Sequence, residues 1–134
     1  MPITAKELVA AARQQITEIA PAAVASELAQ PAPPAPPVLL DVREPGEFAT
    51  AHLQGAINIP RGVLEFQVEA HPAMACSTNP ALAEREREVL VYCRSGGRAA
   101  LAAVALQNMG FTQVRSISGG IDAWTAAGLP VVAS

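Results

Sequence analysis

Short apolar runs alternate with longer amphipathic segments along most of this chain. Residues 89–92 (Val-Leu-Val-Tyr) form the clearest apolar run, rich in β-branched residues and typical of a strand buried on both faces of a parallel sheet. The other runs predict strands, and the segments between them predict helices. This alternation predicts an α/β fold, with a central parallel sheet of about five strands and helices on both faces. The predicted strands are residues 16–19, 38–40, 56–59, 89–92 and 114–117, and the predicted helices are residues 5–15, 22–29, 45–50, 63–68, 98–109 and 121–127.

The first predicted helix stands apart from the rest of the pattern. Thr4 and Glu7 have the spacing of a capping box, which opens a helix over residues 5–15. The 134 residues of the chain are the size of one ordinary domain. We therefore expect residues 1–15 to form an N-terminal helix and residues 16–134 to form a single domain. The helix either packs on that domain or contacts another subunit.

Composition and charge exclude several classes of protein. The formal net charge is −3, which does not support a broad basic face for nucleic acid. The longest apolar run, Ala99–Leu106, is far shorter than the roughly 20 residues that cross a bilayer. No secretory signal is visible at the N-terminus, so the two cysteines, Cys76 and Cys93, are expected to be free thiols in a cytoplasmic protein. The Cys and His residues lack metal-ligand spacing, and neither a metal nor a cofactor is expected.

The segment after the strand at residues 89–92 carries the candidate chemistry. It reads Cys93-Arg94-Ser95-Gly96-Gly97-Arg98 and leads directly into a helix. A cysteine placed there faces the unpaired N–H groups of the first helical turn, which favour an anion. The two glycines allow the positive φ values that turn consecutive N–H groups toward one point. This arrangement favours the thiolate form of Cys93.

Arg98 supports the same interpretation. A cation in the first turn of a helix opposes the helix dipole, so its presence indicates an anion at the loop or a carboxylate partner elsewhere. The simpler alternative is that Cys93 is a small buried apolar residue and that Gly96 and Gly97 only form a tight turn. The combined order of strand, cysteine, glycines, arginine and helix favours the functional interpretation.

This loop resembles the active-site loop of the rhodanese-like sulfurtransferases. Residues 40–60 contain Leu-Asp-Val-Arg-Glu, Glu-Phe and His-Leu-Gln-Gly-Ala-Ile-Asn-Ile-Pro, which resemble the N-terminal signature of that family. Residues 119–124 (Gly-Gly-Ile-Asp-Ala-Trp) resemble its C-terminal signature. The resemblance extends over residues 16–132, with one departure: Ala51 stands where the family usually has glycine. It implies a rhodanese-like fold.

The resemblance also implies an activity. Cys93 would take a sulfane sulfur from a small donor such as thiosulfate, form a persulfide, and pass the sulfur to a thiol or thioredoxin-like acceptor. The backbone N–H groups from Arg94 to Arg98 would stabilise the persulfide anion. The residues expected to bind the donor are Arg94, Ser95, Gly96, Gly97, Arg98 and Arg43.

Loop length separates two chemistries within the superfamily. Phosphatase relatives have a longer loop between the cysteine and the arginine, which enlarges the cradle for phosphate. Here four residues separate Cys93 from Arg98, which suits a single sulfur atom better than a tetrahedral oxyanion. The choice of donor stays open: Arg94 is typical of thiosulfate-type relatives, and Ser95 is typical of mercaptopyruvate-type relatives. We favour thiosulfate.

Several other residues are candidates for supporting roles. Asp41 would pair with Arg98 or accept loop N–H bonds, while Arg43 would meet the sulfonate of the donor; the alternative is an Asp–Arg network that only shapes the loop. Glu47 is expected to pair with an arginine. His52 and Trp124 are expected to be structural residues. Cys76 is either a resolving thiol for Cys93 or an incidental free thiol.

Two rival functions remain open at the level of sequence. Many rhodanese-like domains are non-catalytic sulfur carriers or regulatory modules, but these tend to lose the cysteine that this chain keeps. A small phosphatase or an arsenate reductase would use a similar loop, and the four-residue spacing argues against it. The pattern of residues does not indicate which oligomeric state the protein has.

Overall fold

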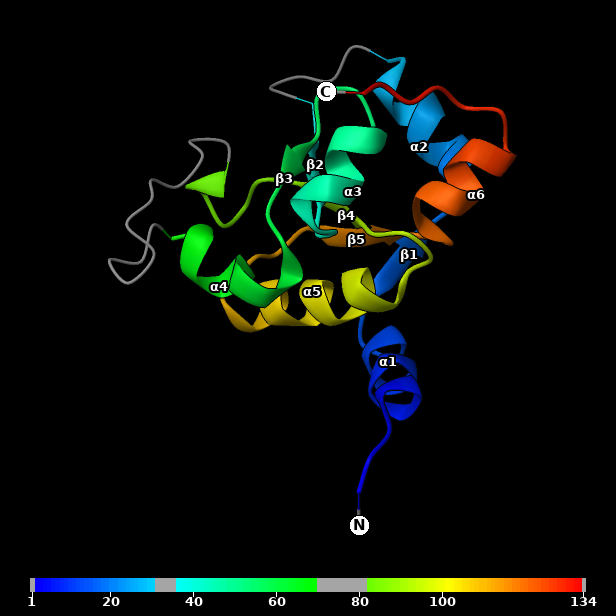
Figure 1. The fold of residues 1–134 in the computed structure, drawn as a ribbon. Coiled ribbons are helices and arrows are strands. Elements are labelled where there is room, and N and C mark those ends of the chain that lie inside the picture. Colours follow the sequence, from blue (N-terminus) through cyan, green and yellow to red (C-terminus); the bar gives the residue numbers. More distant parts are fainter. Residues whose placement is uncertain (1, 31–35, 70–81, 134) are drawn as a thin grey trace.

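A computed structural model describes residues 2–30, 36–69 and 82–133. At its centre is a sheet of five parallel strands in the order β1-β5-β4-β2-β3 (Figure 1). The predicted α/β fold with a parallel sheet is therefore confirmed. The strands are β1 (Thr17–Ile19), β2 (Val38–Asp41), β3 (Ile57–Asn58), β4 (Val89–Tyr92) and β5 (Val114–Ile117).

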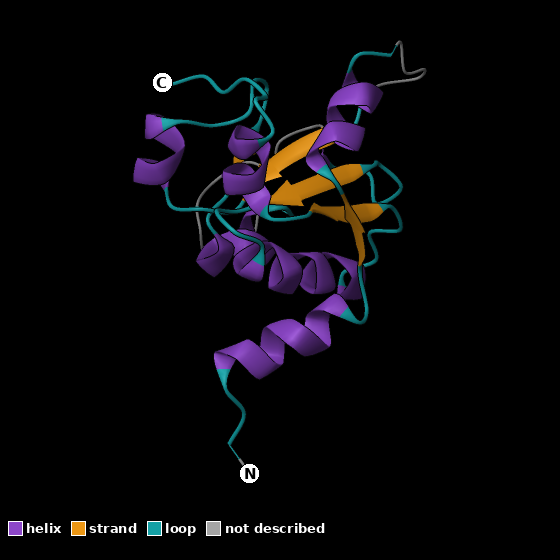
Figure 2. Ribbon diagram, turned by 90° about the vertical axis from the view of Figure 1, so that its right-hand side faces the viewer, coloured by secondary structure: helices purple, strands orange, loops and turns teal. Residues whose placement is uncertain are grey.

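Helices cover both faces of the sheet (Figure 2). Helix α5 lies beneath the sheet in the view of Figure 1, and α2 and α6 lie on the opposite side. The helical elements of the described residues are α1 (Ala5–Arg13), α2 (Pro21–Leu28), α3 (Pro45–Thr50), η1 (Arg61–Val63), α4 (Leu64–Gln67), α5 (Gly97–Asn108) and α6 (Gly120–Ala126).

The two faces bury two separate apolar clusters because successive side chains of a strand point to opposite faces. In β4, Val89 and Val91 join the cluster under α5, while Leu90 and Tyr92 join the cluster under α2 and α6. The α5 side uses small residues, among them Ala99 and Ala102, which let the helix approach the sheet closely. Trp124 is buried on the other face and donates its Nε1–H to the carbonyl of Pro130 at 2.8 Å, which agrees with the expected structural role.

The first helix packs on the body of the protein. Its capping box is present: Glu7 N–H donates to Thr4 Oγ1 at 3.1 Å, and Thr4 N–H donates to the Glu7 carboxylate at 3.0 Å. Ala12 is buried, and a Cβ atom built on Gly97 would lie 3.6 Å from Cγ2 of Val9. Helix α1 therefore lies against the N-terminal end of α5.

The sheet brings the ends of β2 and β4 together. In the parallel register Asp41 is the neighbour of Tyr92, and the N–H of Val42 donates to the carbonyl of Tyr92 at 3.0 Å. Because the carboxyl ends of parallel strands meet at one edge, the segments that follow β2 and β4 are adjacent there. None of the described helices is both long and apolar enough to span a membrane.

Candidate active site

Cys93 follows β4 directly and lies at the N-terminal end of α5. The residue is only 1% exposed. Its Sγ accepts the backbone N–H of Gly96 at 3.1 Å and that of Ala99 at 3.4 Å. Gly96 is the N-cap of α5 and has a φ of 120°, a value that strongly favours glycine. The chain therefore turns around the sulfur before the helix begins.

These contacts make the surroundings of the sulfur favourable for negative charge. The N–H groups belong to the cap and first turn of a twelve-residue helix, where donors lack intrahelical partners and the dipole is positive. The sequence predicts that the N–H donors to Cys93 lie between Arg94 and Arg98, and Gly96 lies in that range. Ala99 lies one residue beyond it. Its position in the first turn of the predicted helix is the signal that could have identified it.

The first turn of α6 hydrogen-bonds to the backbone of the cysteine loop. The N–H of Ile121 donates to the carbonyl of Cys93 at 2.9 Å, and the N–H of Asp122 donates to that of Arg94 at 3.1 Å. A Cβ atom on Gly120 would lie 2.6 Å from the carbonyl oxygen of Arg94, and it would also meet the carbonyl oxygen of Cys93. Gly120 is thus required for close backbone contact, a role that the Gly-Gly pair alone did not reveal.

Arg98 binds Glu47 and thereby joins α5 to α3. Its Nη1 and Nη2 lie 2.8 and 3.1 Å from the two carboxylate oxygens of Glu47. This hydrogen bonding to Arg98, together with the N–H of Glu44, lowers the pKa of Glu47 to about 2. Hydrogen bonding to Glu47 in turn raises the pKa of Arg98, and the charge of Glu47 adds to that shift. The expected pairing of Glu47 with an arginine is therefore present.

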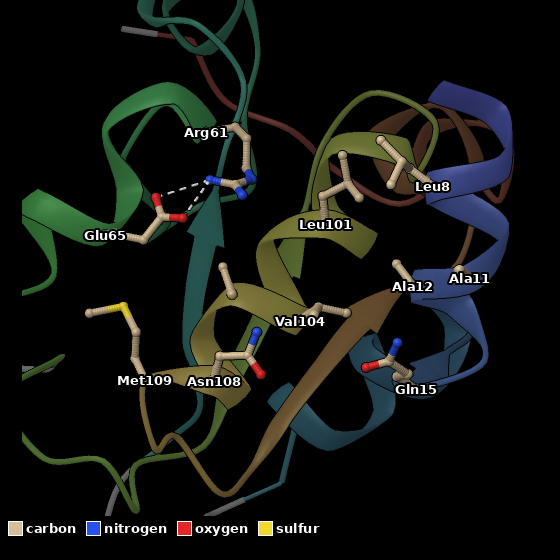
Figure 3. A pocket seen from close by; sticks show the side chains of 11 residues that line it. Leu8, Ala11, Ala12, Gln15, Arg61, Glu65, Leu101, Val104, Asn108 and Met109 are labelled. Atoms are coloured by element: carbon tan, nitrogen blue, oxygen red, sulfur yellow. Dashed lines mark hydrogen bonds and ion pairs between the residues drawn. The ribbon is translucent and has the colours of Figure 1, made fainter. Parts of the chain in front are cut away.

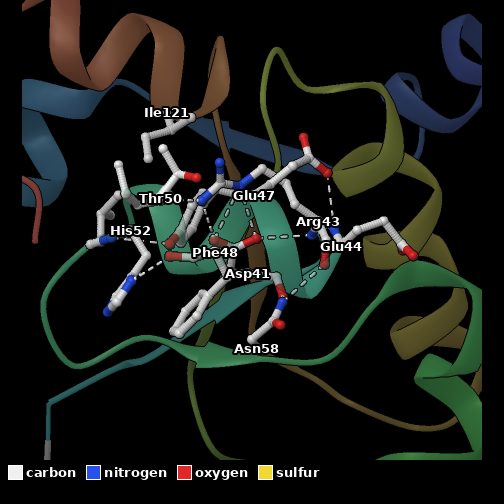
Figure 4. A network of polar contacts seen from close by, with 12 residues as sticks. Asp41, Arg43, Glu44, Glu47, Phe48, Thr50, His52, Asn58 and Ile121 are labelled. Atoms are coloured by element: carbon white, nitrogen blue, oxygen red, sulfur yellow. Dashed lines mark hydrogen bonds and ion pairs between the residues drawn. The ribbon is translucent and has the colours of Figure 1, made fainter. Parts of the chain in front are cut away.

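Asp41 and Arg43 form a separate, buried pair (Figure 4). The Nη2 of Arg43 lies 2.7 Å from Oδ2 of Asp41, its backbone N–H donates to Oδ1 at 2.9 Å, and the side chains are 6% and 0% exposed. Arg43 also donates to the carbonyl of Ala51. Asp41 does not pair with Arg98. Its carboxylate oxygens already accept hydrogen bonds from Arg43, and Arg98 is bound to Glu47. The geometry favours the structural alternative for Arg43 over contact with a sulfonate.

Neighbouring groups complete this polar network. Asn58 donates from Nδ2 to the carbonyl oxygens of Asp41 and Arg43 at 3.1 and 2.9 Å, which ties β3 to the end of β2. The guanidinium of Arg43 lies 5.8 Å from the centre of the Tyr92 ring. Burial raises the pKa of Tyr92, whose hydroxyl accepts the N–H of Leu53 at 3.1 Å. Tyr92 is therefore a neutral structural residue.

The remaining loop residues lie at the surface. Arg94 and Ser95 are exposed, and Nε of Arg94 lies 3.5 Å from the carboxylate of Asp122. They form the solvent side of the loop, while Gly96 and Cys93 form its buried side. Gly97 is partly buried against α1.

His52, which the sequence patterns also name, has a structural position. Nδ1 of His52 lies 2.8 Å from the carbonyl oxygen of Phe48, and the two rings stack at 3.7 Å, which agrees with a structural histidine. Cys76 lies outside the described residues. Within residues 2–30, 36–69 and 82–133, no group of three or more His, Cys, Asp or Glu side chains is placed to hold a metal ion.

A large hollow lies away from the cysteine loop (Figure 3). It has a volume of about 570 Å³ and runs between α1, α5 and the η1–α4 segment. Leu8, Leu101 and Val104 line it, and Arg61 and Glu65 pair at its edge at 3.1 Å. None of the expected site residues lines it, so the candidate chemistry depends on the loop itself.

Comparison with known sequences agrees with this geometry. The family model described as the rhodanese-like domain matches residues 23–127. A sulfurtransferase from Allochromatium vinosum is 32% identical over 96 residues, which cover 72% of this chain and 78% of the relative. Thiosulfate sulfurtransferase 16, a chloroplastic protein of Arabidopsis thaliana, is 39% identical over 104 residues, which cover 70% of this chain and 78% of the relative.

Solved structures show the same architecture. A protein of unknown function from Rhodopseudomonas palustris, described as a possible tyrosine phosphatase, superposes with a TM-score of 0.77 at 31% identity and covers 98% of this chain and 99% of its own. The polysulfide-sulfur transferase homodimer from Wolinella succinogenes superposes with a TM-score of 0.70 at 30% identity, covering 96% of this chain and 87% of its own. With the family match extending over most of its length, this chain belongs to the rhodanese-like domain family.

Proposed function

We propose that this protein is a sulfurtransferase that carries a sulfane sulfur on Cys93. The observation that carries the proposal is the position of its Sγ, which accepts two backbone N–H groups at the start of α5. Such donors stabilise a thiolate and the negative charge of a persulfide in a site with little access to water. Relatives named as sulfurtransferases support the general activity, and we add thiosulfate as the donor.

The reaction proceeds in two displacements. The thiolate of Cys93 attacks the outer sulfur of thiosulfate, a new S–S bond forms on Cys93, and the S–S bond of thiosulfate breaks with its electron pair leaving on sulfite. A thiolate acceptor, such as a small thiol or a thioredoxin-like protein, then attacks the outer sulfur of the persulfide. The acceptor becomes a persulfide and the Cys93 thiolate is restored. The first displacement requires the thiolate form of Cys93, which the backbone N–H donors favour, and it then needs no general base.

The surroundings of Cys93 favour a small donor. The residue is 1% exposed, so a bulky donor has little room at the sulfur. Arg94, at the solvent side of the loop and 71% exposed in its side chain, supplies a cation for an anionic donor. Both features support thiosulfate over larger sulfur compounds.

Intact mass measurement tests the proposal. After incubation with thiosulfate and removal of the excess, the wild-type protein and a Cys76→Ser variant are expected to gain one sulfur atom each. Cys93→Ser is expected to gain none, because it lacks the nucleophile. A label that follows Cys76 instead would contradict the assignment of Cys93.

The same experiment separates the rival functions when an aryl phosphate is included. Hydrolysis of the phosphate without sulfur loading would indicate a phosphatase, the activity suggested in the description of the Rhodopseudomonas palustris structure. Sulfur loading without release to a thiol would indicate a carrier or regulatory module. The proposal requires both loading on Cys93 and release to a thiol.

A further inference from the structure

The N-terminal helix places an arginine against the cysteine loop. Arg13 is in the last turn of α1, and its Nη2 would lie 3.0 Å from a Cβ atom built on Gly96. Gly96 is the residue whose N–H donates to Sγ of Cys93 at 3.1 Å. The guanidinium of Arg13 therefore lies against the residue that donates a hydrogen bond to the sulfur. No family signature quoted above includes Arg13.

The charge of Arg13 is less neutralised than the charges of Arg98 and Arg43. Its Nε lies 4.0 Å from the carboxylate of Glu18, at the limit of an ion pair, and its side chain is 45% exposed. By contrast, Arg98 has two short contacts with Glu47, and Arg43 is buried against Asp41. An exposed pair at 4.0 Å has little strength, so Arg13 keeps most of its capacity to bind an anion.

The position of Arg13 is set by the packing of α1. The capping box orders the start of the helix, and Ala12 and Val9 pack against the body and Gly97. Because Gly96 has no side chain, the guanidinium approaches to 3.0 Å from where a Cβ atom would stand, which is tighter than an ordinary contact. The close approach thus depends on the helix before the sheet and on the glycine in the loop together.

We propose that Arg13 is a donor-binding residue that recognises the anionic end of the sulfur donor while Cys93 attacks the other end. The inference rests on the function proposed above and extends it to the substrate class, a sulfane sulfur compound with an oxyanion group such as the sulfonate of thiosulfate. A guanidinium suits this role because its planar N–H groups bind two oxygens of an oxyanion at once.

The first test measures the charge at the site without sulfur transfer. In a Cys76→Ser background, Cys93 is alkylated with anionic iodoacetate and, separately, with neutral iodoacetamide. Arg13→Gln is expected to lower the ratio of the two rates about two- to fivefold, the effect of one exposed charge pair. Arg13→Lys is expected to retain most of the ratio, because it keeps the charge.

Lys6→Gln is the matched control. Lys6 lies on the same helix, and Lys6→Gln removes the same charge as Arg13→Gln. Lys6 is about 10 Å from Arg13 along the helix axis, a distance greater than the screening length of about 8 Å in physiological salt. Its ratio is expected to match that of the parent. Equal changes in both rates on Arg13→Gln, whether slower or faster, would overturn the proposal and indicate a packing or covering role instead.

The second test uses sulfur loading. Arg13→Gln is expected to raise the KM for thiosulfate about two- to fivefold with little change in kcat. It is expected to leave unaltered the reaction with an uncharged organic trisulfide, in which the Cys93 thiolate attacks the central sulfur, a Cys93–S–S–R adduct forms and an organic thiolate leaves. An equal loss with both donors would overturn the role in donor binding. If the parent protein fails to load from thiosulfate while the alkylation ratio still responds to Arg13, the proposed function fails but the anion-binding residue stands. A Cys93 that neither alkylating reagent reaches would overturn both.

Discussion

Two arginine–carboxylate pairs lie at the carboxyl edge of the sheet, and they differ in their exposure to water. The Asp41–Arg43 pair is 0% and 6% exposed and joins residues two apart in the chain. The Glu47–Arg98 pair is 34% and 38% exposed and joins residues 51 apart. Both involve the segment after β2, yet only the second contacts α5, the helix that follows the Cys93 loop.

The difference in exposure assigns different tasks to the two pairs. A buried charge that loses its partner has no water to replace it, so removing one member of the Asp41–Arg43 pair is expected to destabilise the fold. A half-exposed pair is solvated when it breaks and contributes little to the free energy of unfolding. Its effect is instead local, because it orients Arg98 beside the cysteine loop. The buried pair therefore stabilises the fold, and the half-exposed pair orients Arg98 at the cysteine loop.

Breaking the buried pair is expected to have the strongest effect on folding. Asp41→Asn would leave the guanidinium of Arg43 buried without its directly paired carboxylate, and we expect the free energy of unfolding to fall by about 3–5 kcal/mol. Urea denaturation followed by circular dichroism measures this change. A double variant, Asp41→Asn with Arg43→Gln, is expected to recover part of the loss. If Asp41→Asn lowers the free energy of unfolding by less than about 1 kcal/mol, the buried pair contributes no more than an exposed one, which would contradict this prediction.

Breaking the half-exposed pair is expected to separate activity from stability. Arg98→Gln should change the free energy of unfolding by no more than about 1 kcal/mol, while sulfur loading on Cys93 becomes slower. The charge near the sulfur is lost, but the sheet and its core are untouched. Urea denaturation and time-resolved intact mass give the two values. Loss of folded protein in this variant would instead show that Arg98 is part of the scaffold.

The pH dependence of stability gives the smallest expected effect. Contact with Arg98 lowers the pKa of Glu47 from 4.5 to about 2, so the carboxylate stabilises the folded state above about pH 4.5. This contribution is lost as the pH falls from 4.5 toward 2. We expect wild type to exceed Glu47→Gln in free energy of unfolding by up to about 1 kcal/mol near pH 6. The gap should close under acid conditions. A gap that widens on acidification would contradict the lowered pKa of Glu47.

Local patterns in the chain predicted the elements that present Cys93. The apolar run at residues 89–92 predicted a buried strand, and β4 occupies those residues. The predicted helix over residues 98–109 differs from α5, Gly97–Asn108, by one residue at each end. Both were predictable because a strand's burial and a helix's first turn depend on residues close together in the sequence.

The choice of partners was less predictable. The sequence left Asp41 with either Arg98 and the loop N–H groups or a structural Asp–Arg network; Asp41 binds Arg43, and Glu47 binds Arg98. Several carboxylates and arginines of similar reach converge on one edge of the sheet, and nothing in their spacing ranks the possible pairs. Burial and side-chain direction choose among them, and both depend on how the strands are ordered.

Composition, periodicity and one short loop were therefore enough to establish an α/β fold with a cysteine at the start of a helix, because each of these is a local property of the chain. The contacts of Gly120 with the back of the loop and of Arg13 with Gly96 join residues 27 and 83 positions apart and arise only when the chain folds. Their physical basis is close packing: the backbone at Gly120 and the guanidinium of Arg13 approach the loop closely because glycine occupies the points of contact.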